Sequence, residues 1–284
     1  MVGSLNVDQF AYVDHLPRPG ETIGSRTTRR QLGGKGFNQA VALRQLGAEV
    51  LMIGAVGDDE EGRAFEAELD RRGIDRSGLH RAGAPTGMAL ITVDQSGENT
   101  IVLAPGANLC LDPDRARSAG PVDAVLAQGE LRGETTAAAL ASTPGRRVLN
   151  AAPASTDLFS AIGSTDLVIV NEGEAADLGG IEGIRQHGAK GVVVTLGSKG
   201  ALVDDTVMPA PAVTAVDATG AGDAFCAALT FALVVGSALP EAARFAAAAG
   251  AAACLRPGAS ASMPTREEVE RLLGGPGQLG GERG

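Results

Sequence analysis

From residue 50 onward, short apolar runs alternate with segments of helical periodicity. The apolar runs cover residues 50–56, 124–127, 148–149, 167–170 and 192–196, and helical segments such as 60–72 and 134–141 lie between them. Strands separated by helices usually pair in parallel, because each helix returns the chain to the edge from which the next strand starts. The pattern therefore predicts an α/β fold, a three-layer sandwich whose mostly parallel central sheet is covered by helices on both faces.

Two segments break this rhythm and predict a second, smaller sheet. Residues 9–31 alternate polar and apolar side chains around the sequence Leu16-Pro17-Arg18-Pro19-Gly20, and residues 87–104 have a hairpin pattern whose turn is Gln95-Ser96-Gly97-Glu98. Alternation with period two is typical of strands with one exposed face. The two segments together indicate either a β-sheet lid or an ordinary edge hairpin of the main sheet.

The stretch 213–235 joins a β-prone run ending at Asp217 to a helix that we expect to start at Asp223. The turn between them is Gly220-Ala221-Gly222. A glycine turn before a helix leaves backbone N–H groups free at the positive end of the helix dipole, which forms an anion site. Asp223 is then either the N-cap of the helix or a base that takes a proton from a hydroxyl attacking phosphorus.

Composition and missing motifs exclude several classes of function. The net charge is −10 and the chain has no tryptophan, so a surface that tracks and stacks nucleic acid is not expected. Cys110, Cys226 and Cys254 are widely spaced, which fits free thiols in a reducing cytoplasm. The sequence contains no membrane span, P-loop, complete dinucleotide fingerprint or GxSxG elbow, and its three histidines form no metal-spaced cluster.

Polar residues recur in the loops that follow the predicted strands. They are Asn6, Asp8, Lys35, Asn38, Glu130, Asn171, Glu174 and Thr195. Singly, each has an ordinary interpretation as a turn residue, a solvated charge or a carboxylate in a helix's first turn. Because ligands of open parallel sheets bind beyond the carboxyl ends of the strands, the set as a whole predicts one shared site there.

These loops also carry a resemblance to a known family. The matching segments are 3–8, 19–22, 33–40 (GGKGFNQA), 97–99, 106–108, 171–174, 195–200 and 216–225. They resemble the ribokinase-like (phosphofructokinase-B-type) family of carbohydrate kinases over residues 3 to about 272. The segment from Asp217 to Asp223 is the most diagnostic of the family, and GGKGFNQA with Glu130 favours the members that phosphorylate ribose over those that phosphorylate adenosine or fructose.

The resemblance implies an ATP-dependent kinase that phosphorylates the 5-hydroxyl of D-ribose to give D-ribose 5-phosphate and ADP. Asp223 would be the general base, and the amides of Gly220, Ala221 and Gly222 would form the anion hole. The sugar hydroxyls would be held by the following residues: Asn6, Asp8, Gly34, Lys35, Gly36, Asn38, Glu130 and Asp223. Carboxylates and amides together supply the paired acceptors and donors that a polyol requires.

The same resemblance implies the remaining ligands and partners. ATP would be held by Asn171, Thr195, Leu196, Gly197, Ser198, Lys199, Gly200 and Gly222. Glu174 would organise Mg²⁺ through water. A K⁺ ion would activate the enzyme from a site made by Asp217, Ser262 and the carbonyls of Thr219, Ala253, Arg256 and Gly258. The lid would close over the sugar and pair with a second subunit in a homodimer.

We therefore expect one kinase domain over residues 1–273 and a disordered glycine-rich tail over 274–284. The loop at Asn6 follows only a few residues, so the first strand is either short or begins upstream. Two alternatives to the ribose kinase stay open: a kinase of the same family for deoxyribose, fructose or an adenosine-like nucleoside, and a catalytically silent sugar-binding regulator. A silent relative is expected to lack the base or the anion-hole glycines, which this chain has.

Overall fold

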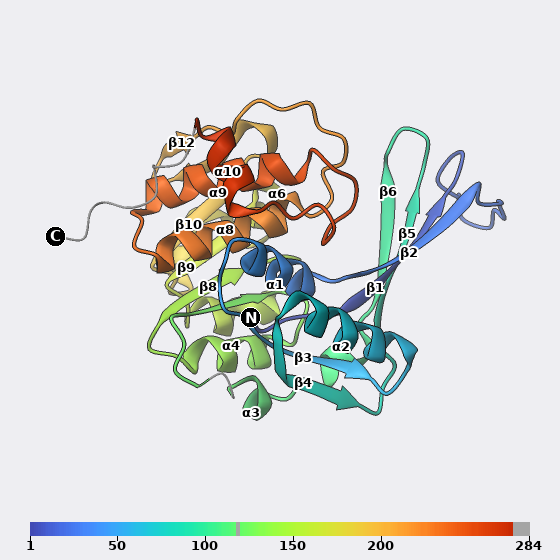
Figure 1. Ribbon diagram of the computed structural model, residues 1–284, viewed down its shortest axis with the longest axis horizontal. Helices are drawn as coiled ribbons and strands as arrows, with labels where there is room; N and C mark the ends of the chain where they lie inside the picture. The colour runs from blue at the N-terminus through green and yellow to red at the C-terminus, as the bar shows by residue number, and fades with distance from the viewer. Residues whose placement is uncertain (118–119, 275–284) are drawn as a thin grey trace.

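The computed structural model describes residues 1–117 and 120–274, and its largest sheet has six strands. Their order is β12 (Thr206–Met208), β11 (Ala201–Val203), β10 (Gly191–Thr195), β9 (Leu167–Asn171), β8 (Arg146–Asn150) and β7 (Ala124–Gln128). From β7 to β10 neighbouring strands are parallel, and β11 and β12 continue the sheet as antiparallel strands. The predicted mostly parallel α/β sheet is confirmed (Figure 1).

A parallel pair, β3 (Leu51–Gly57) and β4 (Asp75–Ala82), is joined to this sheet through the start of the chain. Val2 forms parallel bridges to Ile53 of β3 and to Ala127 of β7. The Met1 amine is buried and donates to the Leu51 carbonyl oxygen at 2.9 Å, and burial lowers its pKa to about 5. The expected first strand is therefore reduced to a single bridging residue, beside a groove of about 650 Å³.

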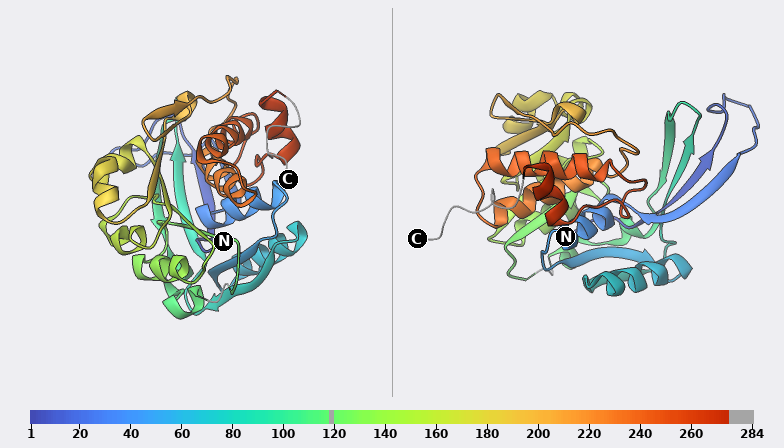
Figure 2. Two further views of the ribbon diagram at one scale, coloured as in Figure 1. Left: turned by 90° about the vertical axis from the view of Figure 1, so that its left-hand side faces the viewer. Right: turned by 45° about the horizontal axis from the view of Figure 1, so that its top comes forward.

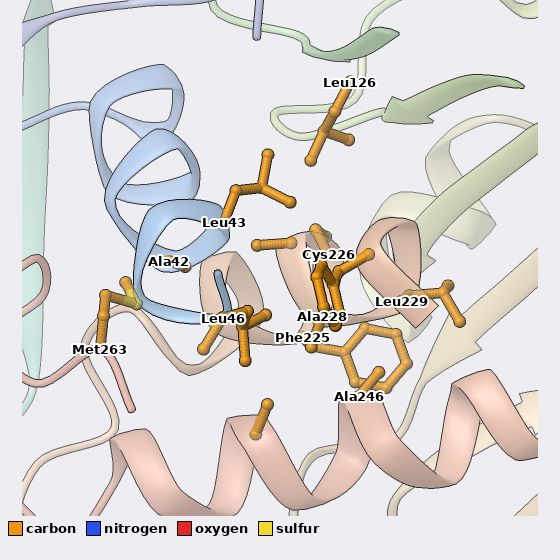
Figure 3. Packing of buried hydrophobic residues seen from close by; sticks show 14 of the residues in the cluster. Ala42, Leu43, Leu46, Leu126, Phe225, Cys226, Ala228, Leu229, Ala246 and Met263 are labelled. Carbon is orange, nitrogen blue, oxygen red and sulfur yellow. The ribbon is translucent and has the colours of Figure 1, made fainter. Parts of the chain in front are cut away.

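Alternate side chains of the central strands pack into two separate hydrophobic cores. Leu126 of β7 belongs to one core, whereas its neighbours Val125 and Ala127 belong to the other. The first core is covered by α1 (Lys35–Gln45), α8 (Ala221–Val234) and α9 (Leu239–Ala253), with α10 (Arg266–Leu272) alongside. Figure 3 shows Leu43, Phe225 and Ala246 meeting from α1, α8 and α9. Period-two burial on a sheet with both faces covered explains why these strands read as continuous apolar runs.

The second core lies under helices on the opposite face, as the left-hand view of Figure 2 shows. These elements are η1 (Gly106–Cys110), α3 (Pro113–Ala116), α4 (Gly133–Ala141), η2 (Thr156–Leu158), α5 (Phe159–Ile162), α6 (Glu172–Asp177) and α7 (Gly180–Gln186). Helix α2 (Glu60–Arg72) covers the β3–β4 pair and has the predicted bounds; it starts at the Asp59 cap and ends at Gly73. Within the described residues, no helix is long and apolar enough to cross a membrane.

Four strands outside the main sheet form the predicted lid. Their order is β2 (Thr27–Gly33), β1 (Asn6–Tyr12), β5 (Gly87–Val93) and β6 (Asn99–Ala104). The sheet projects from one side of the body (Figure 1) and has a small core of its own, made by Phe10, Ala89 and Ile91. A separate sheet replaces the alternative of an edge hairpin. Asn6 and Asp8 lie inside β1, so the expectation that they follow a strand as loop residues is wrong.

Two expectations for the stretch 213–235 are also wrong. Residues 209–215 form no strand, because Pro209 and Pro211 lack N–H donors and the amides of Val216 and Asp217 donate to the Cys254 carbonyl at the end of α9. Helix α8 starts at Ala221 rather than at Asp223, with Gly220 as its N-cap. Of the predicted disordered tail, residues 275–284 lie outside the described part of the chain.

Candidate active site

A cavity of about 620 Å³ lies where the lid meets the body. Most residues predicted for sugar binding and catalysis line it: Asn6, Asp8, Gly34, Lys35, Asn38, Glu130, Gly220 and Asp223. Glu174, Asp217, Thr219 and Gly258 line it as well. Residues that are far apart in the sequence therefore line one cavity, and Asn6 and Asp8 do so from inside β1 rather than from a loop after a strand.

Asp223 lies in the first turn of α8 and is only 7% exposed. Its carboxylate oxygens accept hydrogen bonds from two side chains of α1: Asn38 Nδ2 donates to Oδ2 at 3.0 Å, and Gln39 Nε2 donates to Oδ1 at 2.9 Å. Because α8 has no side-chain cap and Gly220 is its N-cap, the interpretation of Asp223 as the N-cap is wrong. Burial raises the pKa of Asp223, and the nearby Lys35 ammonium opposes that shift.

The turn before α8 lies beside the cavity and carries backbone amides that lack acceptors in the described part of the chain. Gly220 has φ +80°, a conformation that favours glycine, and a Cβ there would lie 2.9 Å from Ala259 Cα. The Ala221 amide donates to the Ala218 carbonyl oxygen at 3.2 Å. For the amides of Gly220 and Gly222, no acceptor is found among the described residues. An uncapped helix N-terminus with free amides is suited to bind an anion.

Glu130 collects hydrogen bonds from the opposite side of the cavity. Its Oε2 accepts from Ser4 Oγ, from Asn6 Nδ2 at 3.3 Å and from the Lys35 backbone N–H at 3.2 Å. The Lys35 amide is in the first turn of α1, whose N-cap Gly34 has φ +87° and no side chain to serve as a cap. Glu130 therefore takes over the role of a capping carboxylate for α1 while it faces the cavity.

Asp8 and Lys35 carry opposite charges into the same space. Burial, followed by the charge of Glu130, raises the pKa of Asp8 to about 7, and a hydrogen bond from the Gln31 side chain acts against that shift. Burial tends to lower the pKa of Lys35, but Asp223 and Glu130 outweigh it, so the pKa is raised. The buried Lys35 ammonium thus interacts with the carboxylates of Asp8, Glu130, Glu174 and Asp223, an arrangement typical of functional sites.

The predicted nucleotide-binding residues lie on neighbouring strands. Asn171 at the end of β9 pairs with Thr195 at the end of β10, and the turn η3 (Gly197–Lys199) follows. Asn171 caps α6 in a reciprocal capping box with Glu174, whose pKa is raised by burial. Glu174 lines the cavity, whereas Asn171 and the residues from Thr195 to Gly200 lie outside its lining, as do Gly36 and Gly222.

The Asp217 carboxylate connects two loops beside the cavity. Oδ1 accepts from the N–H and hydroxyl of Thr219 at 2.9 and 2.6 Å, and Oδ2 accepts from the Gly258 N–H at 2.8 Å. Burial tends to raise the pKa of Asp217, but these hydrogen bonds outweigh it and the pKa is lowered. Ser262, predicted as a cation ligand, donates its hydroxyl to the Ala259 carbonyl oxygen.

Sequence reasoning missed five residues that shape the site. Asn108 donates to Asn6 Oδ1 at 2.7 Å, and Ser4, Gln31 and Gln39 hold Glu130, Asp8 and Asp223. Arg29 lines the cavity from β2, and its positive charge contributes to lowering the pKa of Asp217. For Gln39 the sequence offered a signal, because it is an amide at an otherwise apolar position of a predicted helix. Ser4, Gln31 and Arg29 gave no such signal, because the residues that they contact come from distant parts of the chain.

Comparisons with known proteins identify relatives along nearly the whole chain. The model of the pfkB family carbohydrate kinases matches residues 1–266. The chain is 37% identical to the ribokinase of Haemophilus influenzae, an alignment that covers 96% of this chain and 97% of that protein.

Solved structures give the same result for the fold. The ribokinase of Thermotoga maritima superposes with a TM-score of 0.87 at 34% identity, over 96% of this chain and 97% of the other. The Arabidopsis thaliana ribokinase, solved with ribose and ATP, gives 0.83 at 31% identity with the same coverage. With the family match, the sequence identity and the shared fold in agreement, this chain belongs to the pfkB family of carbohydrate kinases.

Proposed function

We propose that the protein is an ATP-dependent kinase that phosphorylates the 5-hydroxyl of D-ribose, giving D-ribose 5-phosphate and ADP. The observation that carries the proposal is the buried Asp223 carboxylate beside an uncapped helix N-terminus, in a cavity lined by polyol-binding side chains. The similarity to ribokinases over nearly the whole chain supports the choice of substrate. A carboxylate next to an anion site is the arrangement that phosphoryl transfer to a hydroxyl requires.

In the proposed reaction Asp223 acts as the general base. As the sugar oxygen forms a bond to the γ-phosphorus of ATP, the bond from that phosphorus to the ADP oxygen breaks, and the hydroxyl proton passes to Asp223. The amides of Gly220, Ala221 and Gly222 stabilise the charge on the transferring group. The free amides of Gly220 and Gly222 support this role, while the Ala221 amide is shared with Ala218.

The sugar is held by side chains from the lid, from α1 and from the loop after β7. Asn6, Asp8, Lys35, Asn38 and Glu130 supply both donors and acceptors, and the backbone at Gly34 and Gly36 allows close approach. The buried Oδ1 of Asn38 has no hydrogen-bond partner among the described residues, which supports its role as an acceptor for a sugar hydroxyl. The positive charge of Lys35 offsets the repulsion between the carboxylates of the site.

ATP binds over the loop from Thr195 to Gly200 and beside Asn171, with Gly222 near its phosphates. Glu174 has one oxygen in the capping box and lines the cavity, so it is able to organise Mg²⁺ through water. Across residues 1–117 and 120–274 no group of three or more His, Cys, Asp or Glu could hold a metal. This fits a Mg²⁺ held mainly by phosphates and water, where it offsets phosphate charge.

A monovalent cation, K⁺, binds beside the anion hole at Asp217 and Ser262, with the carbonyls of Thr219, Ala253, Arg256 and Gly258. The meeting of the two loops at Asp217 and Gly258 supports this site. Its effect would be to fix the directions of the neighbouring amides. The hydrogen bonds that Asp217 already accepts support the competing interpretation, in which the carboxylate only caps its own turn.

Two further features complete the proposal. Leu90, Ile101, Val102 and Leu103 are exposed on the lid, and two of them, Ile101 and Leu103, also line the cavity. This exposed apolar surface supports a homodimer formed through the lid sheets. Cys110, Cys226 and Cys254 are free thiols. Free thiols and a need for ATP fit the cytoplasm as the place of the reaction.

A coupled ATP-consumption assay tests the substrate. Ribose, deoxyribose, fructose, fructose 6-phosphate and adenosine are compared with Mg²⁺ present, and ribose is expected to give the highest kcat/KM. Much faster turnover of adenosine or fructose 6-phosphate would assign the enzyme to another branch of the family. Binding of ribose without ATP consumption would identify a silent sugar-binding regulator.

A further inference from the structure

A layer of buried amide side chains lies beneath the Asp223 carboxylate. Gln39 of α1 is fully buried and lies outside the cavity lining, so it is not placed to touch a substrate. Its Nε2 donates to Asp223 Oδ1 at 2.9 Å and to Asn150 Oδ1 at 3.1 Å. A hydrogen bond from a fixed neutral donor to a buried carboxylate favours its charged form.

Gln128 of β7 fixes the orientation of the Gln39 side-chain amide. Gln128 is fully buried and its Nε2 donates to Gln39 Oε1 at 2.8 Å. If the Gln39 amide were reversed, its oxygen would face the Asp223 carboxylate and its nitrogen would face the Gln128 nitrogen. Both contacts would be repulsive, so the Gln128 donor selects the orientation in which Gln39 donates to Asp223.

The two oxygens of Asp223 therefore have different surroundings. Oδ2 accepts from Asn38, which lines the cavity and has an unpartnered oxygen suited to a sugar hydroxyl. Oδ1 accepts from Gln39, a residue of α1 whose side chain is enclosed by α8, β7 and β8. When a substrate enters, the contacts of Asn38 are free to change, whereas those of Gln39 are not.

We propose that Gln39 is a positioning residue for the base, fixed in turn by Gln128. It holds Asp223 Oδ1 and leaves Oδ2 as the oxygen that accepts the proton of the substrate hydroxyl. This inference deepens the proposed kinase function and rests on it.

The charges around Asp223 predict the direction of the effect. Burial raises its pKa; Lys35 and the hydrogen bonds from Gln39 and Asn38 lower it, and Glu130 raises it. Asp8 on the lid and Cys226 on α8 also interact electrostatically with Asp223. Loss of the Gln39 donor leaves burial and the acidic neighbours less opposed. The pKa of Asp223 should then rise, so that the base is protonated up to a higher pH.

Gln39→Met tests the proposal, because methionine has a similar length but lacks the amide. We expect kcat to fall about 10- to 100-fold at neutral pH. The KM for ribose should stay within about twofold, since the cavity lining is intact, and the acidic limb of the kcat–pH profile should move to higher pH. The matched control is Gln45→Met, on the exposed side of the same helix. Unchanged kcat and an unchanged limb in folded Gln39→Met would overturn the proposal.

Gln128→Met separates positioning from stability. Gln128 Oε1 is buried without a hydrogen-bond partner among the described residues, so replacing it removes an unsatisfied oxygen. The same change leaves the buried Gln39 Oε1 without its donor, so the two effects on Tm oppose each other and we expect only a small net change. Even so, kcat should fall about three- to tenfold, because the Gln39 amide is no longer held in one orientation. A lower Tm with unchanged kcat would indicate a purely structural role and contradict the proposal.

A measurement without sugar distinguishes this inference from the substrate assignment. The pKa of Asp223 is followed by ¹³C NMR of labelled aspartate carboxyls in the free protein, with Asp223→Asn to assign the signal. A higher pKa in Gln39→Met than in the wild type supports the positioning role, whichever sugar the enzyme uses. The same pKa in both proteins overturns it, even where ribose proves to be the substrate.

Discussion

Helix α8 and strand β6 both contribute residues to the cavity, but they are built in opposite ways. Every residue of α8 from Asp223 to Leu233 is buried, whereas every residue of β6 is exposed. The helix is fixed by packing against α1 and α9, and the strand is an edge of a sheet whose own core is small. The carboxylate of Asp223 therefore lies on the rigid side of the cavity, whereas the exposed apolar surface that can contact a second subunit lies on the lid.

The rigid side should give the largest effect on mutation. Asp223→Asn keeps the shape of the side chain but removes the base, so we expect kcat to fall on the order of 10²–10⁴-fold. Ribose binding, measured by calorimetry, should change much less. Asp177→Asn, in the helix α6, serves as the control. Near-normal kcat in folded Asp223→Asn would show that the rigid side does not carry the base.

The pH dependence of kcat/KM tests Asp8, which lies on lid strand β1 where the lid meets the body. Its pKa is raised to about 7 by burial, so below pH 7 the carboxylate is increasingly protonated and loses acceptor capacity for the sugar. We expect kcat/KM for ribose to fall by up to about tenfold per pH unit below 7. The contribution of Asp8 to stability has the opposite sign: it is present below the unfolded pKa and is lost as pH rises through 7.

Asp8→Asn provides the comparison for this pH profile. The variant should bind ribose more weakly than the wild type above pH 7 and lack the limb near pH 7, while a limb due to Asp223 is retained. Persistence of the limb near pH 7 in Asp8→Asn would assign it to a different group.

The dependence of the rate on the monovalent cation tests the loop from Asp217 to Gly220, which precedes α8. Replacing K⁺ by Na⁺ or tetramethylammonium at fixed ionic strength should lower the rate several-fold, because the loop that carries the anion-hole amides loses support. Asp217→Ala should abolish the difference between the cations. Equal rates in K⁺ and tetramethylammonium over a full titration would favour the interpretation of Asp217 as a turn cap.

The lid should give the smallest effect on catalysis and the largest on assembly. Val102→Glu places a charge in the exposed apolar surface of β6, at a residue outside the cavity lining, so we expect the dimer to dissociate in sedimentation equilibrium. Catalysis should weaken only about two- to threefold in kcat/KM. Val207→Glu, at an exposed valine of strand β12, is the matched control. A wild-type protein that sediments as a monomer at all concentrations would remove the proposed dimer.

The same contrast explains what could be predicted from the sequence. The central strands were placed within one or two residues, because buried parallel strands are continuous apolar runs. Strands β11 and β12 have three residues each and give too short a pattern. The start of α8 was placed two residues late, because it depends on the φ of +80° at Gly220, which sequence periodicity does not report.

The residues of the site were predicted mainly where the family motif names them. Asn6, Asp8, Asn38, Glu130 and Asp223 do meet in one cavity. Their supporting partners were missed, because a contact such as that of Ser4 with Glu130 joins positions 126 residues apart. Such contacts follow from the packing of the lid on the body and leave no local pattern.

Because Val2 is, in the part of the chain that the structure describes, the single residue that bridges β3 and β7, few backbone hydrogen bonds join these two parts of the molecule. Within the described residues, the backbone hydrogen bonds between β3 and β7 are only those of Met1, Val2 and Gly3, so we expect β3, β4 and α2 to open at lower free energy than the six-stranded sheet. In native-state hydrogen exchange, the amides of β3 and β4 should therefore exchange before those of β8 and β9 at the centre of the six-stranded sheet.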